Sequence, residues 1–442
     1  TGSGSHNLEN GALARVDTII VGDEFGSVGR LRVAGDGTRW TKNANPVSRI
    51  IVGNSGRGEM EIADGALVEA SLAIGVSGND SSVDEGVVAV RGEGSRLVAP
   101  EISAGLGGAG ELILEGAATV GHRRVTSSLL AVSSRVDAAS EGGGAASVVV
   151  SDSASFEVGP DEGFLNLGPG ARVEIVSGGR LSATNIDQAF GGTAVVVGAG
   201  STLTASESYQ LEGQLRVEDQ ATLEVGLERF EIEGAGSLNI KTGGNVQADQ
   251  VVTRDFARIN ITDPTSIVDA LDVRLEGGEV EIGGAARISA SNASTEVPIT
   301  LTGSGEMFVG ISLAVSGVGT VKTVEGAVTV GETNPIVGEL RVGPGGVLSG
   351  TGTVVGTVRD VGGNVAPGFS PGVLKIDGDY IQESGGLLTL EIGGRSPGDL
   401  HDQLVITGDA MFDGRVILRF TRQFSPTAGD AFDLLQVDGI VD

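Results

Sequence analysis

One serine lies in a spacing that hydrolases use for a nucleophile. Residues 368–372 read Gly-Phe-Ser-Pro-Gly, which matches the G-x-S-x-G pattern with Ser370 at its centre. That pattern needs a helix directly after the serine, because the helix and the preceding strand present the hydroxyl on a sharp turn. Here Pro371 is followed by Val-Leu-Lys-Ile at 373–376, which has the alternation of a strand. We therefore expect Ser370 to lie in a turn with no catalytic role.

Histidine and carboxylate pairs are the next candidates for acid and base chemistry. His401 precedes Asp402, and Asp377 lies two residues before Asp379, so that we expect both aspartates on one face of a strand. Neighbouring residues of a strand point to opposite faces, which separates a histidine from an adjacent aspartate. Paired carboxylates would suit a glycoside hydrolase or a lyase. However, Trp40, Tyr209 and Tyr380 are the only Trp and Tyr residues available to line a sugar-binding cleft.

The remaining histidines and glycine patterns also argue against a catalytic or cofactor site. His6 lies in a start that resembles a cloning remnant, and His122 lies in an arginine-rich turn. Residues 105–110 fit G-x-G-x-x-G, but a strand follows at 111–114 where a dinucleotide site requires a helix. The chain has no cysteine, and neither an EF-hand loop nor the calcium-binding nonapeptide occurs. The sequence predicts no enzyme, with no catalytic residue, no cofactor and no metal site.

Composition points to an architecture with a thin aliphatic core. Of 442 residues 74 are glycine, whereas Phe, Trp and Tyr number 12, 1 and 2. The net charge of −29 disfavours binding to nucleic acid or to an anionic lipid surface. No run of 18 apolar residues occurs, so we expect no membrane span in this chain.

A repeat explains this composition. The pattern Gly, any residue, apolar, any residue, apolar recurs along the chain, with gaps near one or two multiples of about 25 residues. It begins at Gly29, Gly58, Gly110, Gly163, Gly213, Gly236, Gly278, Gly305 and Gly338. Gly-Ala turns recur in step at residues 11, 65, 116 and 170. Each unit reads as two or three short strands separated by turns.

Such a unit cannot bury its own apolar face, but stacked units form a shared core. The sequence predicts an all-β fold, a right-handed parallel β-helix (β-solenoid) of about 25-residue coils, with about 18 coils in all. Glycine suits the tight corners because it tolerates positive φ. We expect a solenoid repeat region over 1–340 and a C-terminal β cap over 341–442.

The sequence pattern changes in the C-terminal segment, and the residues there resemble those of a known family. Residues 345–354 are rich in glycine, residues 365–372 read Val-Ala-Pro-Gly-Phe-Ser-Pro-Gly, and Asp-Gln-Leu-Val-Ile-Thr-Gly follows at 402–408. These residues resemble the end of the passenger region of bacterial autotransporters, the type V secretion family, with its glycine-rich β-strand repeats. The resemblance implies an end to the solenoid just before a membrane-embedded barrel in that family. We expect Pro367 and Pro371 to interrupt strand pairing and to close the coil edge.

These features lead to a functional hypothesis. We expect a non-catalytic, rod-like extracellular protein of the bacterial cell surface that makes adhesive or structural contacts. Its expected partners are a host or neighbouring-cell surface, surface glycans, or a second copy joined head to tail. Two alternatives stay open, a self-assembling fibre or sheath subunit and a β-helix enzyme that degrades polysaccharide.

Overall fold

A computed structural model confirms an all-β parallel solenoid. It describes residues 3–15, 17–41, 49–74, 85–99, 101–104, 108–116, 118–121, 135–138, 145–159, 163–263, 265–302, 305–315, 320–324, 327–330, 338–421 and 423–442. Every element assigned in these residues is a strand, and none is a helix that could cross a membrane. The chain divides into two compact units, unit 1 up to Glu231 and unit 2 from Gln247, with the residues between them shared.

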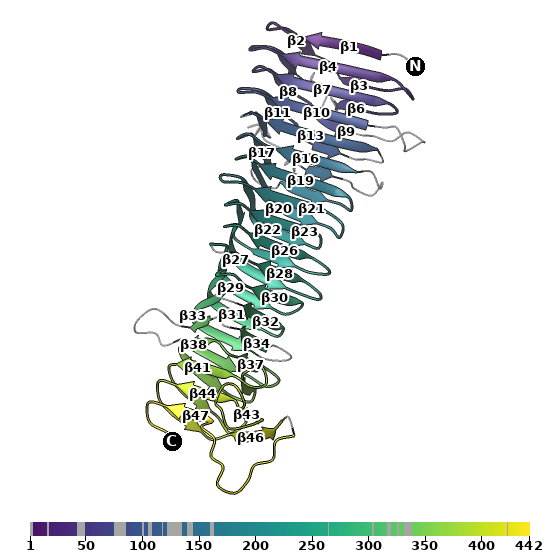
Figure 1. The fold of residues 1–442 in the computed structure, drawn as a ribbon. Helices are drawn as coiled ribbons and strands as arrows, with labels where there is room; N and C mark the ends of the chain where they lie inside the picture. The colour runs from purple at the N-terminus through teal and green to yellow at the C-terminus, as the bar shows by residue number, and fades with distance from the viewer. Residues whose placement is uncertain are drawn as a thin grey trace. The chain divides into compact units, whose positions relative to one another are not determined.

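Each coil contributes strands to three parallel ladders. In unit 1 the first ladder runs in order from β1 to β23 (Figure 1). Its strands are β1 (Ser3–Leu8), β4 (Val28–Ala34), β7 (Arg57–Ala63), β10 (Glu85–Arg91), β13 (Ala109–Glu115), β16 (Ala146–Val150), β19 (Ala171–Val176), β21 (Thr193–Val197) and β23 (Gln214–Glu218).

The second and third ladders form the other sheet of unit 1. The second ladder comprises β2 (Leu13–Arg15), β5 (Arg39–Thr41), β8 (Leu67–Glu69), β11 (Arg96–Val98), β14 (Thr119–Gly121), β17 (Ser155–Val158) and β24 (Thr222–Val225). The third comprises β3 (Thr18–Val21), β6 (Arg49–Val52), β9 (Ser71–Ile74), β12 (Glu101–Ala104), β15 (Arg135–Ala138) and β18 (Phe164–Leu167). The long strands β20 (Arg180–Gln188) and β22 (Thr202–Leu211) serve both ladders.

Unit 2 repeats this arrangement. Its first ladder comprises β28 (Arg258–Ile261), β30 (Glu279–Ile282), β32 (Pro298–Thr302), β34 (Thr320–Val324), β37 (Val347–Gly350), β40 (Asn364–Pro367), β43 (Leu387–Ile392) and β46 (Arg415–Phe420). The long strands β29 (Ile267–Leu275), β31 (Arg287–Thr295) and β33 (Glu306–Val315) again serve the other two ladders.

The remaining strands of unit 2 are short. The second ladder continues with β35 (Ala327–Val330), β38 (Thr353–Val355), β41 (Val373–Asp377), β44 (Gln403–Ile406) and β47 (Leu435–Val437). The third continues with β36 (Glu339–Val342), β39 (Thr357–Asp360), β42 (Tyr380–Gln382) and β45 (Ala410–Phe412). Strands β25 (Arg229–Ile232), β26 (Ser237–Lys241) and β27 (Asn245–Thr253) lie where the two units divide.

The coil number agrees with the sequence prediction, although coil length varies. The sheet of first-ladder strands has 18 members in the described residues, one for each coil. Ser3 pairs with Val28, 25 residues later, but Val347 pairs with Asn364 after 17 and Gly110 with Ala146 after 36. Length varies because loops leave the stack at the corners while the strand register is kept. The right-handed sense stays a prediction.

The core is a stack of aliphatic side chains from alternate strand positions. Leu31, Met60, Val88, Leu112 and Val148 occupy one column of the first ladder, and all are buried. Alternation along each strand leaves the intervening side chains on the outer face.

The repeated glycines have two structural causes. Gly65 has φ +83° at a corner, as expected of a tight turn. Gly58 has no such angle, but a Cβ there would lie 2.3 Å from the Gly53 nitrogen and from the Val21 oxygen. Close approach of the backbone, rather than positive φ, therefore accounts for this motif glycine.

The glycine motifs do not all mark the same face. Gly29, Gly58 and Gly110 share one column of the first ladder. Gly163 instead precedes β18 in the third ladder, and Gly305 precedes β33 in the second. The same glycine motif thus occurs before strands of all three ladders. The spacing between successive motifs is uneven because they do not mark equivalent points of each coil.

The expectation that Pro367 and Pro371 close the coil edge is wrong. Strand β40, which ends at Pro367, pairs with β37 on one side and with β43 on the other. The ladders also continue through residue 341, since β34 pairs with β37 and β36 with β39. The C-terminal segment consists of further coils with an insert at 393–402 between β43 and β44.

Candidate functional site

The structure brings the Ser370 loop and the His401–Asp402 pair together. Residues 368–372 join β40 to β41 and fold around the carboxylate of Asp402. Asp402 Oδ1 accepts a hydrogen bond from the Gly372 amide at 2.9 Å, and Oδ2 accepts one from the Glu391 amide at 2.7 Å. A Cβ on Gly368 would lie 2.5 Å from Asp402 Oδ1, so only glycine fits there. Asp402 therefore fastens this loop to β43.

Burial changes the acidity of Asp402. The side chain is 2% exposed, and loss of solvation raises its pKa to about 6. The two backbone hydrogen bonds oppose this shift, whereas the nearby charge of Glu391 adds to it. One Glu391 oxygen, Oε2, is buried without a hydrogen-bond partner in the described residues.

His401 does not form a catalytic pair with Ser370 or Asp402. Its Nδ1 lies 3.1 Å from the carbonyl oxygen of Gly394, and its Nε2 is buried without a partner in the part of the chain that the structure describes. The ring meets Phe432 edge-on at 5.7 Å. His401 and Asp402 both lie in the insert between β43 and β44, outside any strand, and both side chains are buried, so the expected alternation along a strand does not apply to them. The carboxylate of Asp402 accepts its hydrogen bonds from backbone amides, and neither ring nitrogen of His401 hydrogen-bonds to it in the described residues.

Asp377 and Asp379 lie on the two sides of a corner, which corrects the expectation that they share a strand face. Asp377 ends β41, Gly378 forms the bend, and Asp379 precedes β42. Asp377 accepts a hydrogen bond from the Thr407 hydroxyl at 2.8 Å, and Asp379 accepts one from the Asp409 amide at 2.8 Å. Both carboxylates therefore join their coil to the next one.

The remaining candidate residues that the structure describes lie in strands or in the core. Gly110 lies within β13, so a strand follows the glycine-rich segment as expected; residues 105–107 and His122 lie outside the described residues. Trp40, Tyr209 and Tyr380 are buried in the core and line no outer cleft. In the described part of the chain, no group of three His, Cys, Asp or Glu side chains could hold a metal ion.

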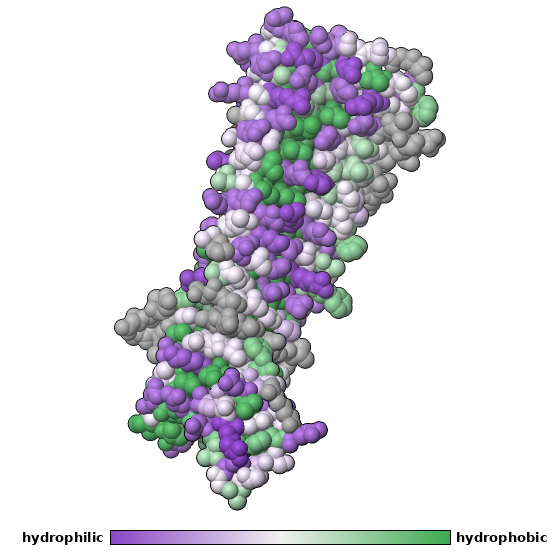
Figure 2. Space-filling model, viewed as in Figure 1, coloured by the Kyte–Doolittle hydropathy of each residue, from purple (hydrophilic) through white to green (hydrophobic). Residues whose placement is uncertain are grey.

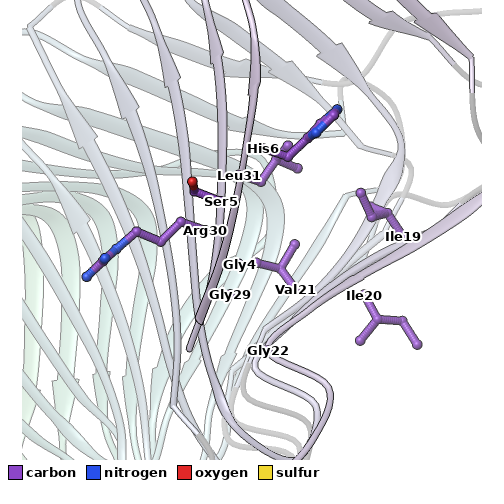
Figure 3. A pocket seen from close by; sticks show the side chains of 10 residues that line it. All are labelled: Gly4, Ser5, His6, Ile19, Ile20, Val21, Gly22, Gly29, Arg30 and Leu31. Atoms are coloured by element: carbon purple, nitrogen blue, oxygen red, sulfur yellow. The ribbon is translucent and has the colours of Figure 1, made fainter. Parts of the chain in front are cut away.

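A cavity of about 290 Å³ lies beside the first coil (Figure 3). His6, Val21 and Leu31 are among the side chains that line it, and Arg30 points away to the other side of its strand. His6 has no carboxylate beside it in this lining. The cavity therefore lacks the paired acid and base that hydrolysis requires.

The outer face of the first ladder in unit 1 carries a network of ion pairs. Arg30 lies 2.7 Å from Glu59, and Arg32 contacts Glu61 at 2.8 Å. The Arg30 hydrogen bond lowers the pKa of Glu59. Arg91 continues the network to Glu115 at 2.9 Å. These side chains are about 31–61% exposed, so each pair contributes little stability and remains accessible to a partner.

Sequence reasoning singled out the inward residues of this face and missed the outward ones. The signal was present, since Gly-Arg-Leu-Arg-Val at 29–33 and Gly-Glu-Met-Glu-Ile at 58–62 place arginines and glutamates at equal positions. Aligning these repeats strand by strand would have predicted the ion pairs.

Comparison with known proteins adds no assignment. No protein-family model matches the chain, and no curated protein matches it.

Proposed function

We propose that this chain is a non-catalytic extracellular protein of the bacterial surface, a solenoid passenger that mediates adhesive or structural contacts. The observation that supports this proposal best is that the candidate catalytic carboxylates serve as structural hydrogen-bond acceptors. Asp402, Asp377 and Asp379 each accept hydrogen bonds that hold one coil or loop to another. Groups committed in this way are not positioned to transfer protons to a substrate.

The outer faces support contact rather than turnover. Parallel strands about 4.8 Å apart carry outward side chains in straight columns, which gives flat arrays instead of a cleft. Such arrays suit recognition of an extended surface, since solenoids bind along their faces.

The resemblance of the segment from residue 345 onward to autotransporter passengers supports the location. It is the basis for proposing export to the cell surface.

Adhesion of coated beads tests the proposal. Beads carrying the folded chain should bind to at least one surface in a panel of epithelial cells, bacterial cells and immobilised glycans. Beads carrying the heat-unfolded chain provide the control. Binding that unfolding does not reduce, or no binding to any surface, would contradict the proposed role.

A further inference from the structure

A strip of aliphatic side chains lies on the outer face of the first ladder in unit 1. Figure 2 shows apolar side chains gathered along β10, β13 and β16, with hydrophilic ones on either side. The strip comprises the half-buried outward residues Val87, Ile113, Val149, Val195 and Val197, with Ala89 buried among them. We call this strip and its charged border, from β7 to β23, the β16 face.

The strand register gives the β16 face a charge pattern centred on β16. One column runs from Glu61 in β7 through Val149 in β16 to Arg216 in β23. Glu61 lies three strands before Val149, and Arg216 lies three strands after it. The column thus has an acid and a base at equal distances from its midpoint.

A second column repeats the pattern at shorter range. Glu111 in β13 lies one strand before Ser147 in β16, and Arg172 in β19 lies one strand after it. Arg172 also contacts Glu174 on its own strand, while its side chain stays 61% exposed.

A two-fold axis along β16 would use both columns. Such an axis keeps each column in place and reverses the strand order in the second copy. It sets Glu61 against Arg216 and Glu111 against Arg172, each twice, because the contact is isologous. In the same arrangement Ala89 faces Val195 and Val149 faces its own copy. Ile113 in β13 faces Glu174 in β19, whose carboxylate stays paired with Arg172 on its own strand. Moving the axis by half a strand sets Arg32 against Arg216 and loses the match.

We propose that unit 1 binds a second copy of this chain face to face through the β16 face, related by this axis. The two sheets pack about 10 Å apart with their solenoid axes antiparallel. The aliphatic strip lies at the centre, and the opposite charges fix the register. This inference goes beyond the proposed surface role, because it concerns the purified chain in solution.

The size of the face indicates weak, reversible association. Seven strands span about 29 Å, and five residues of strand span about 17 Å. The projected area is about 490 Å² per copy, compared with about 800 Å² in stable complexes. We expect a dissociation constant of about 10 µM or weaker.

Sedimentation velocity of the full chain between about 1 and 200 µM tests the proposal. Val149→Glu places two carboxylates against each other at the axis and should weaken association by at least about 100-fold. Ile51→Glu is the matched control, since Ile51 is a half-buried outward residue of β6 in the third ladder. It should change the dissociation constant by less than about two-fold. Circular dichroism verifies that both variants keep their strand content.

Exchanging the charges of Glu111 and Arg172 tests whether the dimer uses the proposed register, as opposed to losing affinity through any change of surface charge. Arg172→Glu alone and Glu111→Arg alone should each weaken association by about ten-fold, since each leaves like charges facing across the axis. The double variant should return to within about three-fold of the parent, because opposite charges face each other again. A parent that stays monomeric at 200 µM, a dimer that survives Val149→Glu, or a double variant as weak as the single ones would overturn the proposal.

Discussion

The corner that follows the third ladder is built by an amide at the end of β20 in unit 1 and by a carboxylate at the end of β39 in unit 2, where the next coil again uses an amide, Gln382. Gln188 Nε2 donates hydrogen bonds to the carbonyl oxygens of Gly192 at 2.9 Å and Gln214 at 2.8 Å. Asp360 instead accepts hydrogen bonds from the amides of Gly363 and Leu387, both at 2.8 Å. Both side chains are fully buried. One task, holding a corner to the next coil, is thus performed with opposite hydrogen-bond polarity.

The aromatic neighbours of these corners differ in the same way. The Tyr209 hydroxyl donates to Gln188 Oε1, and its ring packs on Phe230 at 5.2 Å. The Tyr380 hydroxyl is buried without a partner in the described residues, close to the charge of Asp360, which adds to the effect of burial in raising the Tyr380 pKa. The amide of Gln188 thus accepts a hydrogen bond from the neighbouring tyrosine hydroxyl, whereas the carboxylate of Asp360 leaves the Tyr380 hydroxyl without a partner in the described residues. Only the second should respond to pH.

Removing the carboxylate corner should have the largest effect. Asp360→Ala leaves the Gly363 amide without its acceptor and opens a gap, so unit 2 should lose about 2–4 kcal/mol of unfolding free energy. Urea unfolding followed by circular dichroism measures it. Gln188→Ala is the matched variant and should lose a similar amount in unit 1. A loss below about 1 kcal/mol for Asp360→Ala would show that the corner does not depend on the carboxylate.

The sequence predicted the coil period and the parallel stack. It could not predict the corner carboxylates. Asp360 reads locally as a strand-end aspartate, and its partner Leu387 lies 27 residues further along the chain. Asp402 likewise depends on Gly372, 30 residues earlier. Contacts of this kind follow from the register of the stacked coils. Because the loops vary in length, a fixed repeat period in the sequence does not give that register.

The pH dependence of stability should separate the buried carboxylates of unit 2, Asp360 and Asp402, from the uncharged amide corner of unit 1. Burial raises the pKa of Asp402 to about 6 and raises the pKa of Asp360, compared with about 3.9 when unfolded. A raised folded pKa gives stability that is fully present below about pH 3.9 and is lost as pH rises through about 6. For Asp402 this amounts to at most about 3 kcal/mol.

Amide hydrogen exchange at Gly372 and Glu391 measures this dependence between pH 4.5 and 7.5, after correction for the intrinsic exchange rate. Protection should decrease as pH rises in the parent and change less in Asp402→Asn, which cannot ionise. An equal slope in both proteins would rule out Asp402 as the titrating group.

Replacing either tyrosine by phenylalanine should change the unfolding free energy less than removing a corner side chain, and the two replacements should differ from each other. Tyr209→Phe removes the donor to Gln188 and should reduce unfolding free energy by about 1–2 kcal/mol. Tyr380→Phe removes a buried hydroxyl that has no partner and should leave stability within about 0.5 kcal/mol or raise it. Urea unfolding of both variants compares them, and a larger loss for Tyr380→Phe would contradict the assigned hydrogen bonds.

Exposed ion pairs should matter least. Arg30→Ala breaks the pair with Glu59, whose side chains are 61% and 31% exposed, and should change unfolding free energy by less than about 0.5 kcal/mol. The same urea assay measures it. A loss above about 1.5 kcal/mol would mean that the outer charges support the fold rather than face a partner.

The central claim is that the buried carboxylates hold the coils together and do no chemistry. Its most direct test is Asp402→Asn, assayed both for adhesion of coated beads and for turnover of a surface-polysaccharide panel. The account predicts no turnover by the parent and adhesion by Asp402→Asn within about two-fold of the parent. Turnover by the parent that Asp402→Asn abolishes would contradict it.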